Sequence, residues 1–396
     1  MTSRPAIDQT AVEKGLQGRG KENTLDAPAA KSLPRLQSLA VVDVDVHIHD
    51  SPGALAPHCE EPWRRLLEHL DTLPMQNLSI PQFAPFSNPW PNWPQAPTRT
   101  SSVSTPAQMR SDLDDLGVRV GVMFPDNLLF HALLRGSDFP LAVAKAYNRW
   151  LTSEWLGVHS GLKGVVIAPS QDPIVAAQEI SKYADNPDIV GVFLPTVAVD
   201  PLYGNRCYDP VYAAAQEAQL PVFLHSVTAL SPVFPFNIQG YETLFSAHII
   251  SHSFALMANL LSMIETGVPV RFPGLNIVFS EGGIGWVPWM MMKLDKEFSE
   301  RRRELPILTE RPSYYIKRQM YFATQPIEEP DQLADVAALI DLCDGSERIM
   351  FASDWPHHDF DHPAKLLQLP VSDDVQRKIM SGNAARLLRL DLTDGR

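Results

Sequence analysis

Eight short apolar runs, separated by segments with helical spacing, constrain the fold of this chain more than any other feature. Continuous apolar strands that alternate with amphipathic helices are typical of a parallel sheet covered by helices. Eight such units predict an α/β fold, a closed (β/α)8 TIM barrel, rather than an open doubly wound sheet. The first run is not followed by GxGxxG, which disfavours a dinucleotide-binding fold. The runs cover residues 39–47, 118–124, 162–168, 189–194, 221–225, 275–280, 319–324 and 348–353.

The barrel is predicted to occupy residues 37–396, behind a flexible N-terminal arm at 1–36 that is polar and aperiodic. The connection after the first strand is about sixty residues long, which is unusual inside a compact domain. We predict an inserted cover loop at 75–106, where Trp90 and Trp93 stand among prolines. It is interpreted either as a cover whose tryptophans bind the substrate or as an oligomer contact.

Charge and composition exclude several classes of partner. The chain has 33 Lys and Arg against 46 Asp and Glu, without a basic patch, so we expect no nucleic acid partner. No run approaches the ~20 apolar residues of a membrane helix, and no secretory signal is visible. Cys59, Cys207 and Cys343 are scattered and fit neither a disulfide framework nor a zinc finger. We therefore expect a cytoplasmic protein with a small-molecule substrate.

Three histidines end two of the predicted strands. His47 and His49 are two residues apart, so the period of a strand places both imidazoles on one face. His225 ends the apolar run PVFLH. Because the carboxyl ends of all barrel strands meet at the catalytic face, these side chains are predicted to share one divalent metal ion.

Two aspartates extend this set. Asp354 follows the eighth run and is predicted both to bind the metal and to take a proton from metal-bound water. Asp45 has the same strand parity as His47 and His49. Two roles stay open for it: it orients a ligand through a hydrogen bond, or it replaces His49 as a ligand.

Further polar side chains lie near the expected catalytic face. Glu281 follows the sixth run. Its alternative roles are a general base, a metal ligand, a substrate contact, or a structural carboxylate paired with an arginine. His248 and His252 are four apart and share one helix face, and His248 is the candidate for the active site. His357 belongs to the loop WPHHDFDHP and is a candidate substrate-binding residue.

Motifs in a fixed order carry a resemblance that covers roughly residues 40–392. They are DVHIH, AKAYNRWL, LKGVVIAPSQDP, YDPVYAAAQEAQLPVFLHS, RFPGLNIVFSEGGIGWVPWMMMKLD, SDWPHHDFDHP and GNAARLL. Together they resemble the amidohydrolase superfamily, and more narrowly its amidohydrolase 2 branch of metal-dependent hydrolases and aminocarboxymuconate-semialdehyde decarboxylase-like enzymes.

The resemblance implies one divalent ion bound by His47, His49, His225 and Asp354. Zinc is the first choice for this ion and manganese the second. It also implies a homodimer or larger oligomer. Dinuclear members use a carbamylated lysine from the fourth strand, but IVGVFLPTVAVD contains no lysine. Mononuclear members often carry a histidine after the sixth strand, where this chain has Glu281.

Three functions follow as alternatives. The first expectation is a hydrolase, in which metal-activated water attacks an amide, ester or activated C–C bond and Asp354 accepts the proton. The second is non-oxidative decarboxylation of an aromatic or enol-type acid, which the missing sixth-strand histidine disfavours. The third is a degenerate barrel that only binds a ligand.

Overall fold

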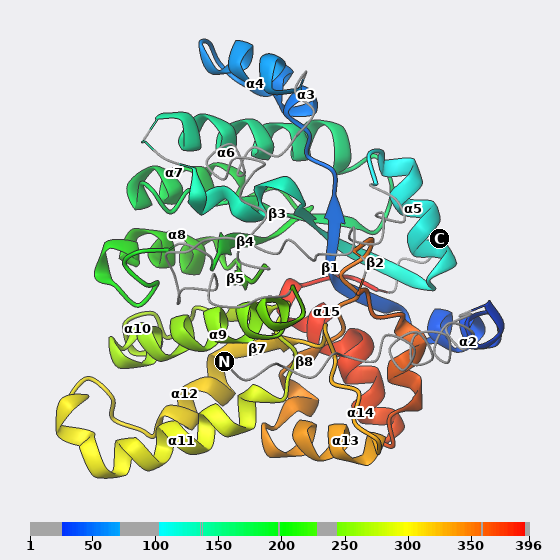
Figure 1. Ribbon diagram of the computed structural model, residues 1–396, viewed down its shortest axis with the longest axis vertical. Coiled ribbons are helices and arrows are strands. Elements are labelled where there is room, and N and C mark those ends of the chain that lie inside the picture. The colour runs from blue at the N-terminus through cyan, green and yellow to red at the C-terminus, as the bar shows by residue number, and fades with distance from the viewer. Residues whose placement is uncertain are drawn as a thin grey trace, which may run out of the picture.

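The structure is a computed structural model that describes residues 26–71, 103–134, 136, 138–196, 199–227, 244–357 and 359–392. Its strands form one parallel eight-stranded sheet in chain order, with helices outside it, which confirms the predicted TIM barrel (Figure 1). The strands are β1 (Val41–Ile48), β2 (Val118–Pro125), β3 (Leu162–Ile167), β4 (Ile189–Pro195), β5 (Val222–His225), β6 (Ile277–Ser280), β7 (Met320–Ala323) and β8 (Ile349–Met350).

Helices follow the strands and cover the outside of the sheet; α7 and α8 lie side by side there (Figure 1). None of the described helices is long and apolar enough to cross a bilayer. The α-helices are α2 (Asp26–Leu39), α3 (Pro52–Leu55), α4 (Trp63–Asp71), α5 (Pro106–Asp115), α6 (Asp138–Trp150), α7 (Pro173–Tyr183), α8 (Asp209–Ala218), α9 (Leu244–Glu265), α10 (Val268–Arg271), α11 (Trp286–Arg301), α12 (Pro312–Gln319), α13 (Leu333–Leu342), α14 (Asp373–Arg377) and α15 (Asn383–Leu388).

The N-terminal segment differs in part from the sequence expectation. Helix α2 begins at Asp26, so residues 26–36 are helical instead of forming part of an arm. Leu36 is fully buried and α2 packs against β2, and this tertiary contact compensates for a weak local pattern with Pro34 inside the helix. Residues 1–25 lie outside the described residues, as does 72–102, which contains Trp90 and Trp93.

The barrel closes through the segment that follows β8. The Asp354 backbone N–H donates to the Asp45 carbonyl at 2.9 Å, and the His47 N–H donates to the Trp355 carbonyl at 2.7 Å. A parallel bridge joins Val46 to Trp355. Because β8 itself has only two residues, these bonds fix the Asp354 segment beside β1.

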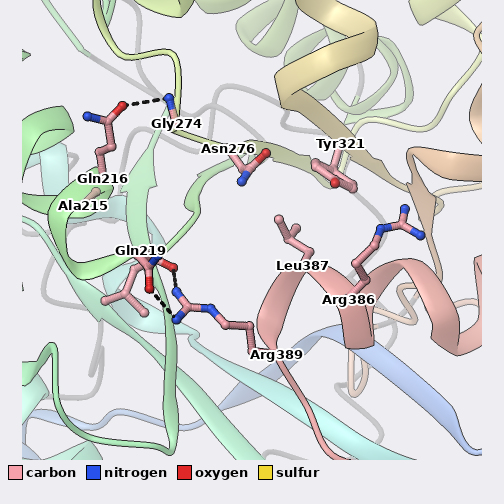
Figure 2. Close-up of a pocket in the computed structure, with 10 residues that line it drawn as sticks. Ala215, Gln216, Gln219, Gly274, Asn276, Tyr321, Arg386, Leu387 and Arg389 are labelled. Atoms are coloured by element: carbon pink, nitrogen blue, oxygen red, sulfur yellow. Dashed lines mark hydrogen bonds between the residues drawn. The ribbon is translucent and has the colours of Figure 1, made fainter.

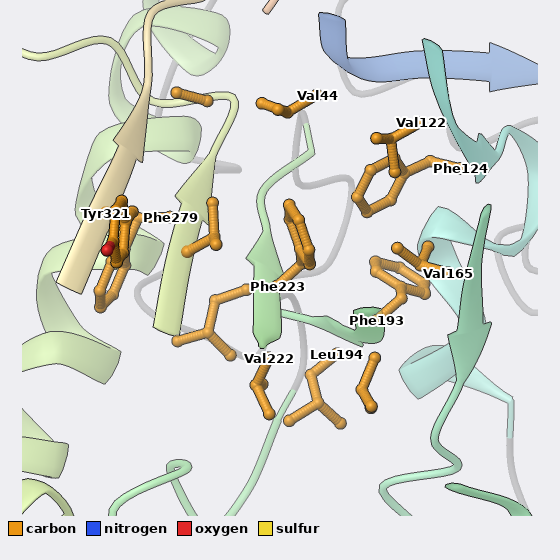
Figure 3. Packing of buried hydrophobic residues seen from close by; sticks show 14 of the residues in the cluster. Val44, Val122, Phe124, Val165, Phe193, Leu194, Val222, Phe223, Phe279 and Tyr321 are labelled. Carbon is orange, nitrogen blue, oxygen red and sulfur yellow. The ribbon is translucent and has the colours of Figure 1, made fainter. Parts of the chain in front are cut away.

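Aromatic side chains fill the barrel beneath its carboxyl-terminal end (Figure 3). Phe124 meets Phe193 and Phe223 edge-on, with ring centroids 5.9 and 5.4 Å apart. The same Phe124 ring lies 5.0 Å from the ring of His225. These side chains give the histidines above them an apolar floor that excludes water.

Candidate metal centre and active site

The ends of β1, β5, β6 and β8 bring together five ionisable side chains that the sequence analysis had singled out. Asp45 and Asp354 are fully buried, His47 and His225 are 1% exposed, and Glu281 is 5% exposed. They converge because each one ends a parallel strand, or lies close to the end of one, at the catalytic face of the barrel.

The centre of this cluster consists of two imidazoles and two carboxylates. His47 Nε2 lies 3.3 Å from Asp45 Oδ1 and 3.0 Å from Asp354 Oδ1. His225 Nε2 lies 2.9 Å from the same Asp45 oxygen. Three side chains from β1 and β5 therefore place one donor atom each around a common point, within 4.8 Å of one another.

The tautomers follow from the backbone contacts of the two rings. His47 Nδ1 is 2.9 Å from the Pro125 carbonyl, and His225 Nδ1 is 2.6 Å from the Ser226 carbonyl. A carbonyl oxygen only accepts, so both Nδ1 atoms carry the hydrogen and both neutral rings turn an Nε2 lone pair toward the carboxylates. Lone pairs and carboxylates repel each other unless a cation lies between them, and this donor set therefore fits a divalent ion.

Protonation of the cluster without an ion leads to the same conclusion. Burial lowers the pKa of His47, but the carboxylates of Asp354 and Asp45 outweigh burial and raise the pKa to about 10. A proton then takes the place that the cation would hold, and metal binding would release it. His47 Nε2 and Asp45 Oδ2 are buried and lack a hydrogen-bond partner in the described part of the chain.

A second group of possible ligands shares a residue with the first. His47, Asp354 and His357 also place donor atoms within 4.8 Å of one another. Since Nδ1 of His47 is bonded to a carbonyl, only its Nε2 is available, and one nitrogen cannot bind two ions. This geometry supports a single ion.

His49 does not join the cluster. Its Nδ1 lies 3.6 Å from Asp126 Oδ2, and its side chain is 21% exposed. Alternate residues of a strand share a face but are about 6.6 Å apart along it. His225 therefore lies beside Asp45 and His47, and His49 is one step too far along β1 to contact it. The geometry thus favours the alternative in which Asp45 replaces His49 as a ligand.

Glu281 contacts two histidines. Its Oε2 lies 3.3 Å from His225 Nδ1, and its Oε1 lies 3.4 Å from His252 Nδ1. Burial, together with the charges of Asp354 and Asp45, raises the pKa of Glu281 well above its usual range. Glu281 therefore contacts imidazoles of the site. The ion pair with an arginine, which the sequence analysis gave as one alternative, is not formed among the described residues.

Glu281 and Asp354 both have left-handed backbone conformations, with φ of 61° and 65°. Residues other than glycine adopt this region only at an energetic cost, and such residues cluster at functional sites. From these positions both carboxylates contact histidines of the cluster.

The long helix α9 contributes His252, which the sequence analysis paired with His248 without making it the active-site candidate. His252 is 4% exposed, and its Nδ1 donates to the Glu281 carbonyl at 3.1 Å. Burial, with the nearby His248, lowers the pKa of His252 to about 3. The HxxxH spacing of His248 and His252 indicated that both lie on one face of the helix. It does not show which of the two rings faces the site.

His248 lies farther out, with its ring centroid 4.7 Å from that of His252. Its Nε2 is 3.3 Å from Asp359 Oδ2, and the two side chains are 26% and 24% exposed. This pair joins α9 to the loop after β8 at the edge of the site. Asp359 was missed because the DFDHP sequence does not tell a site carboxylate from a turn residue.

His357 touches the cluster directly. Its Nδ1 lies 2.7 Å from Asp354 Oδ1, and its ring stacks on that of His47 at 4.2 Å. Its Nε2 lies 3.4 Å from Asp126 Oδ1. Burial lowers the pKa of His357, but the carboxylates of Asp354 and Asp126 raise it well above its usual range.

A separate cavity of about 420 Å³ lies at the opposite, amino-terminal end of the strands (Figure 2). Gln216, Asn276, Tyr321 and Arg386 line it, and Arg389 donates to Gln219 at its edge. In TIM barrels this end contributes to stability, while chemistry occurs at the carboxyl end. The histidine and carboxylate cluster is therefore the candidate active site.

Metal content gives the first prediction. We expect one divalent ion per chain by elemental analysis. Nε2 is the ring nitrogen of His47 that is left for metal binding, and it can bind only one ion. His225→Ala should lose most of the ion, whereas His49→Ala should keep it. Two ions per chain, or equal loss in both variants, would contradict this arrangement.

Comparisons with known proteins show the family of the chain. The family model described as amidohydrolase matches residues 44–390. A γ-resorcylate decarboxylase of Rhodococcus jostii (strain RHA1) is 27% identical over 279 residues, which covers 63% of this chain and 77% of that protein.

Solved structures resemble this chain in fold. 5-Carboxyvanillate decarboxylase from Sphingomonas paucimobilis superposes with a TM-score of 0.66 at 19% identity, covering 89% of this chain and all (100%) of that one. A dihydroxybenzoic acid decarboxylase from Polaromonas sp. JS666, solved with manganese and the inhibitor 2-nitroresorcinol, has a TM-score of 0.62 at 17% identity and covers 88% of this chain and 97% of its own.

Proposed function

The chain belongs to the amidohydrolase family, and from this premise we propose that it is a divalent-metal-dependent decarboxylase of a hydroxylated aromatic acid. The observation that carries the proposal is a buried histidine and carboxylate centre in a chain whose relatives decarboxylate such an acid. This was the second function in the sequence analysis. The first, a hydrolase, has no counterpart among these relatives.

The residues of the site fit this chemistry. Asp45, His47, His225 and Asp354 would hold the ion, zinc or manganese, which supplies positive charge for the carboxylate and a neighbouring hydroxyl of the substrate. The phenylalanine floor below His225 excludes water and offers an apolar surface to an aromatic ring.

The proposed reaction needs one proton for each turnover. The bond between the ring carbon and the carboxylate breaks, and its electron pair stays on the ring carbon, which forms a C–H bond as CO2 leaves. We assign the proton transfer to Asp354, because its carboxylate lies at the end of β8 beside His47. Glu281, which contacts His225 from the other side, keeps that ring oriented.

Product analysis tests the reaction class. With 2,6-dihydroxybenzoate and the manganese-loaded protein, we expect CO2 release and entry of one solvent deuteron at the ring carbon. Incorporation of 18O from labelled water, without CO2, would favour the hydrolase instead. Protein that binds the metal but leaves panels of aromatic acids, amides and esters unchanged would indicate the ligand-binding alternative.

The assembly is a separate proposal. We propose that the enzyme is a homodimer, which rests on the family resemblance alone. Light scattering on the purified full chain measures its mass directly, and a monomer at working concentration would refute it. The cytoplasmic location stays a prediction.

A further inference from the structure

The geometry points to a role for His357 that differs from substrate binding: we propose that it is the positioning residue of Asp354. Its Nδ1 donates to Asp354 Oδ1 at 2.7 Å, the shortest of the contacts that join a histidine to a carboxylate in this cluster. The inference rests on the proposed metal centre.

Asp354 needs such support because of its place in the fold. It lies four residues after the two-residue strand β8 and has a left-handed backbone. Its carboxylate therefore projects from a turn and not from a regular strand. Its other oxygen, Oδ2, accepts a hydrogen bond from Gln325 Nε2 at 3.3 Å, so both oxygens are held by side chains.

The imidazole of His357 is itself held on two sides. Its ring stacks on His47 at an interplanar angle of 26°, and Asp126 accepts from its Nε2 at 3.4 Å. Asp126 comes directly after β2, and its second oxygen faces His49. A chain of side chains thus runs from Asp354 through His357 and Asp126 to His49 and connects the ends of β8, β2 and β1.

This arrangement explains why His49 is at the site without joining the cluster. Partners of a metal ligand fix its orientation, and their loss usually lowers metal affinity about 10- to 100-fold. His357 acts on the ion through Asp354, and Asp126 holds the His357 ring, while His49 lies at the far end of this chain of contacts.

Two variants separate the contribution of the His357 hydrogen bond from the contribution of its ring. His357→Phe keeps a flat ring that can stack on His47 but removes both nitrogens. His357→Asn removes the ring but keeps an N–H donor near the position of Nδ1. The matched control is His362→Asn in the same loop, where His362 Nδ1 accepts from the Ala364 N–H and asparagine can do the same.

The measurement is the Mn2+ dissociation constant of the metal-free protein in competition with a chelating dye, with thermal unfolding recorded in parallel. We expect His357→Phe to weaken binding about 10- to 100-fold without lowering the unfolding temperature. His357→Asn should recover most of this loss, and the control should match wild type.

Two results would overturn the inference. Unchanged affinity in His357→Phe would leave Asp354 oriented without His357. An equal loss in both variants would make the imidazole itself the requirement, as for a direct ligand. Because this readout involves no substrate, an error in the proposed reaction cannot imitate either result.

Discussion

Asp354→Asn should reduce turnover by roughly 10³-fold, the range expected for losing a positioned acid–base group. Asparagine has the same shape and tolerates the left-handed backbone that Asp354 adopts. Its side-chain oxygen can still accept from Gln325. The folded structure should therefore persist, and the loss should appear in kcat, measured at saturating metal with thermal unfolding as a check.

The control for this variant is Asp361→Asn. Asp361 is also a buried aspartate after β8, but it accepts from the Ile327 N–H and pairs with Lys365 outside the cluster. Its loss should lower stability and leave the turnover of folded enzyme near normal. Near-normal turnover in Asp354→Asn would remove this residue from the proton transfer.

Glu281→Gln should lower turnover on the order of 10²-fold, the second largest effect expected, because Glu281 orients the His225 ring. The amide keeps the shape of the side chain but can neither gain nor lose a proton beside His225 and His252. At saturating metal the ion content should hold, because Glu281 acts through His225 and is not a ligand. Elemental analysis and steady-state kinetics on the same preparation measure both quantities.

Glu328→Gln is the matched control in the neighbouring loop. Glu328 accepts from the backbone N–H groups of Ile284 and Gly285, and so holds the start of α11 without touching the cluster. Loss of the ion in Glu281→Gln would make Glu281 a ligand. Reduced thermal stability with normal turnover would make it a structural carboxylate, and His252 would be the next residue to test.

Several site residues were predictable because their signals are local. His225 ends β5, Glu281 directly follows β6, and His47 and Asp354 lie close to the ends of β1 and β8, and in a parallel barrel such positions meet at one face. No knowledge of side-chain direction was needed. Asp126 also follows a strand directly, but an aspartate after a proline is an ordinary turn residue, so the sequence did not distinguish it.

The sequence by itself determined the eight strands, their parallel order and the end of the barrel at which the candidate site residues meet. These follow from the period of apolar residues and from the connections between strands. Only the tertiary structure decided that Asp45, rather than His49, faces His225, that His252 lies inside His248, and that His357 donates to Asp354. These choices depend on depth along a strand and on the facing of a helix, which arise only when distant segments pack together.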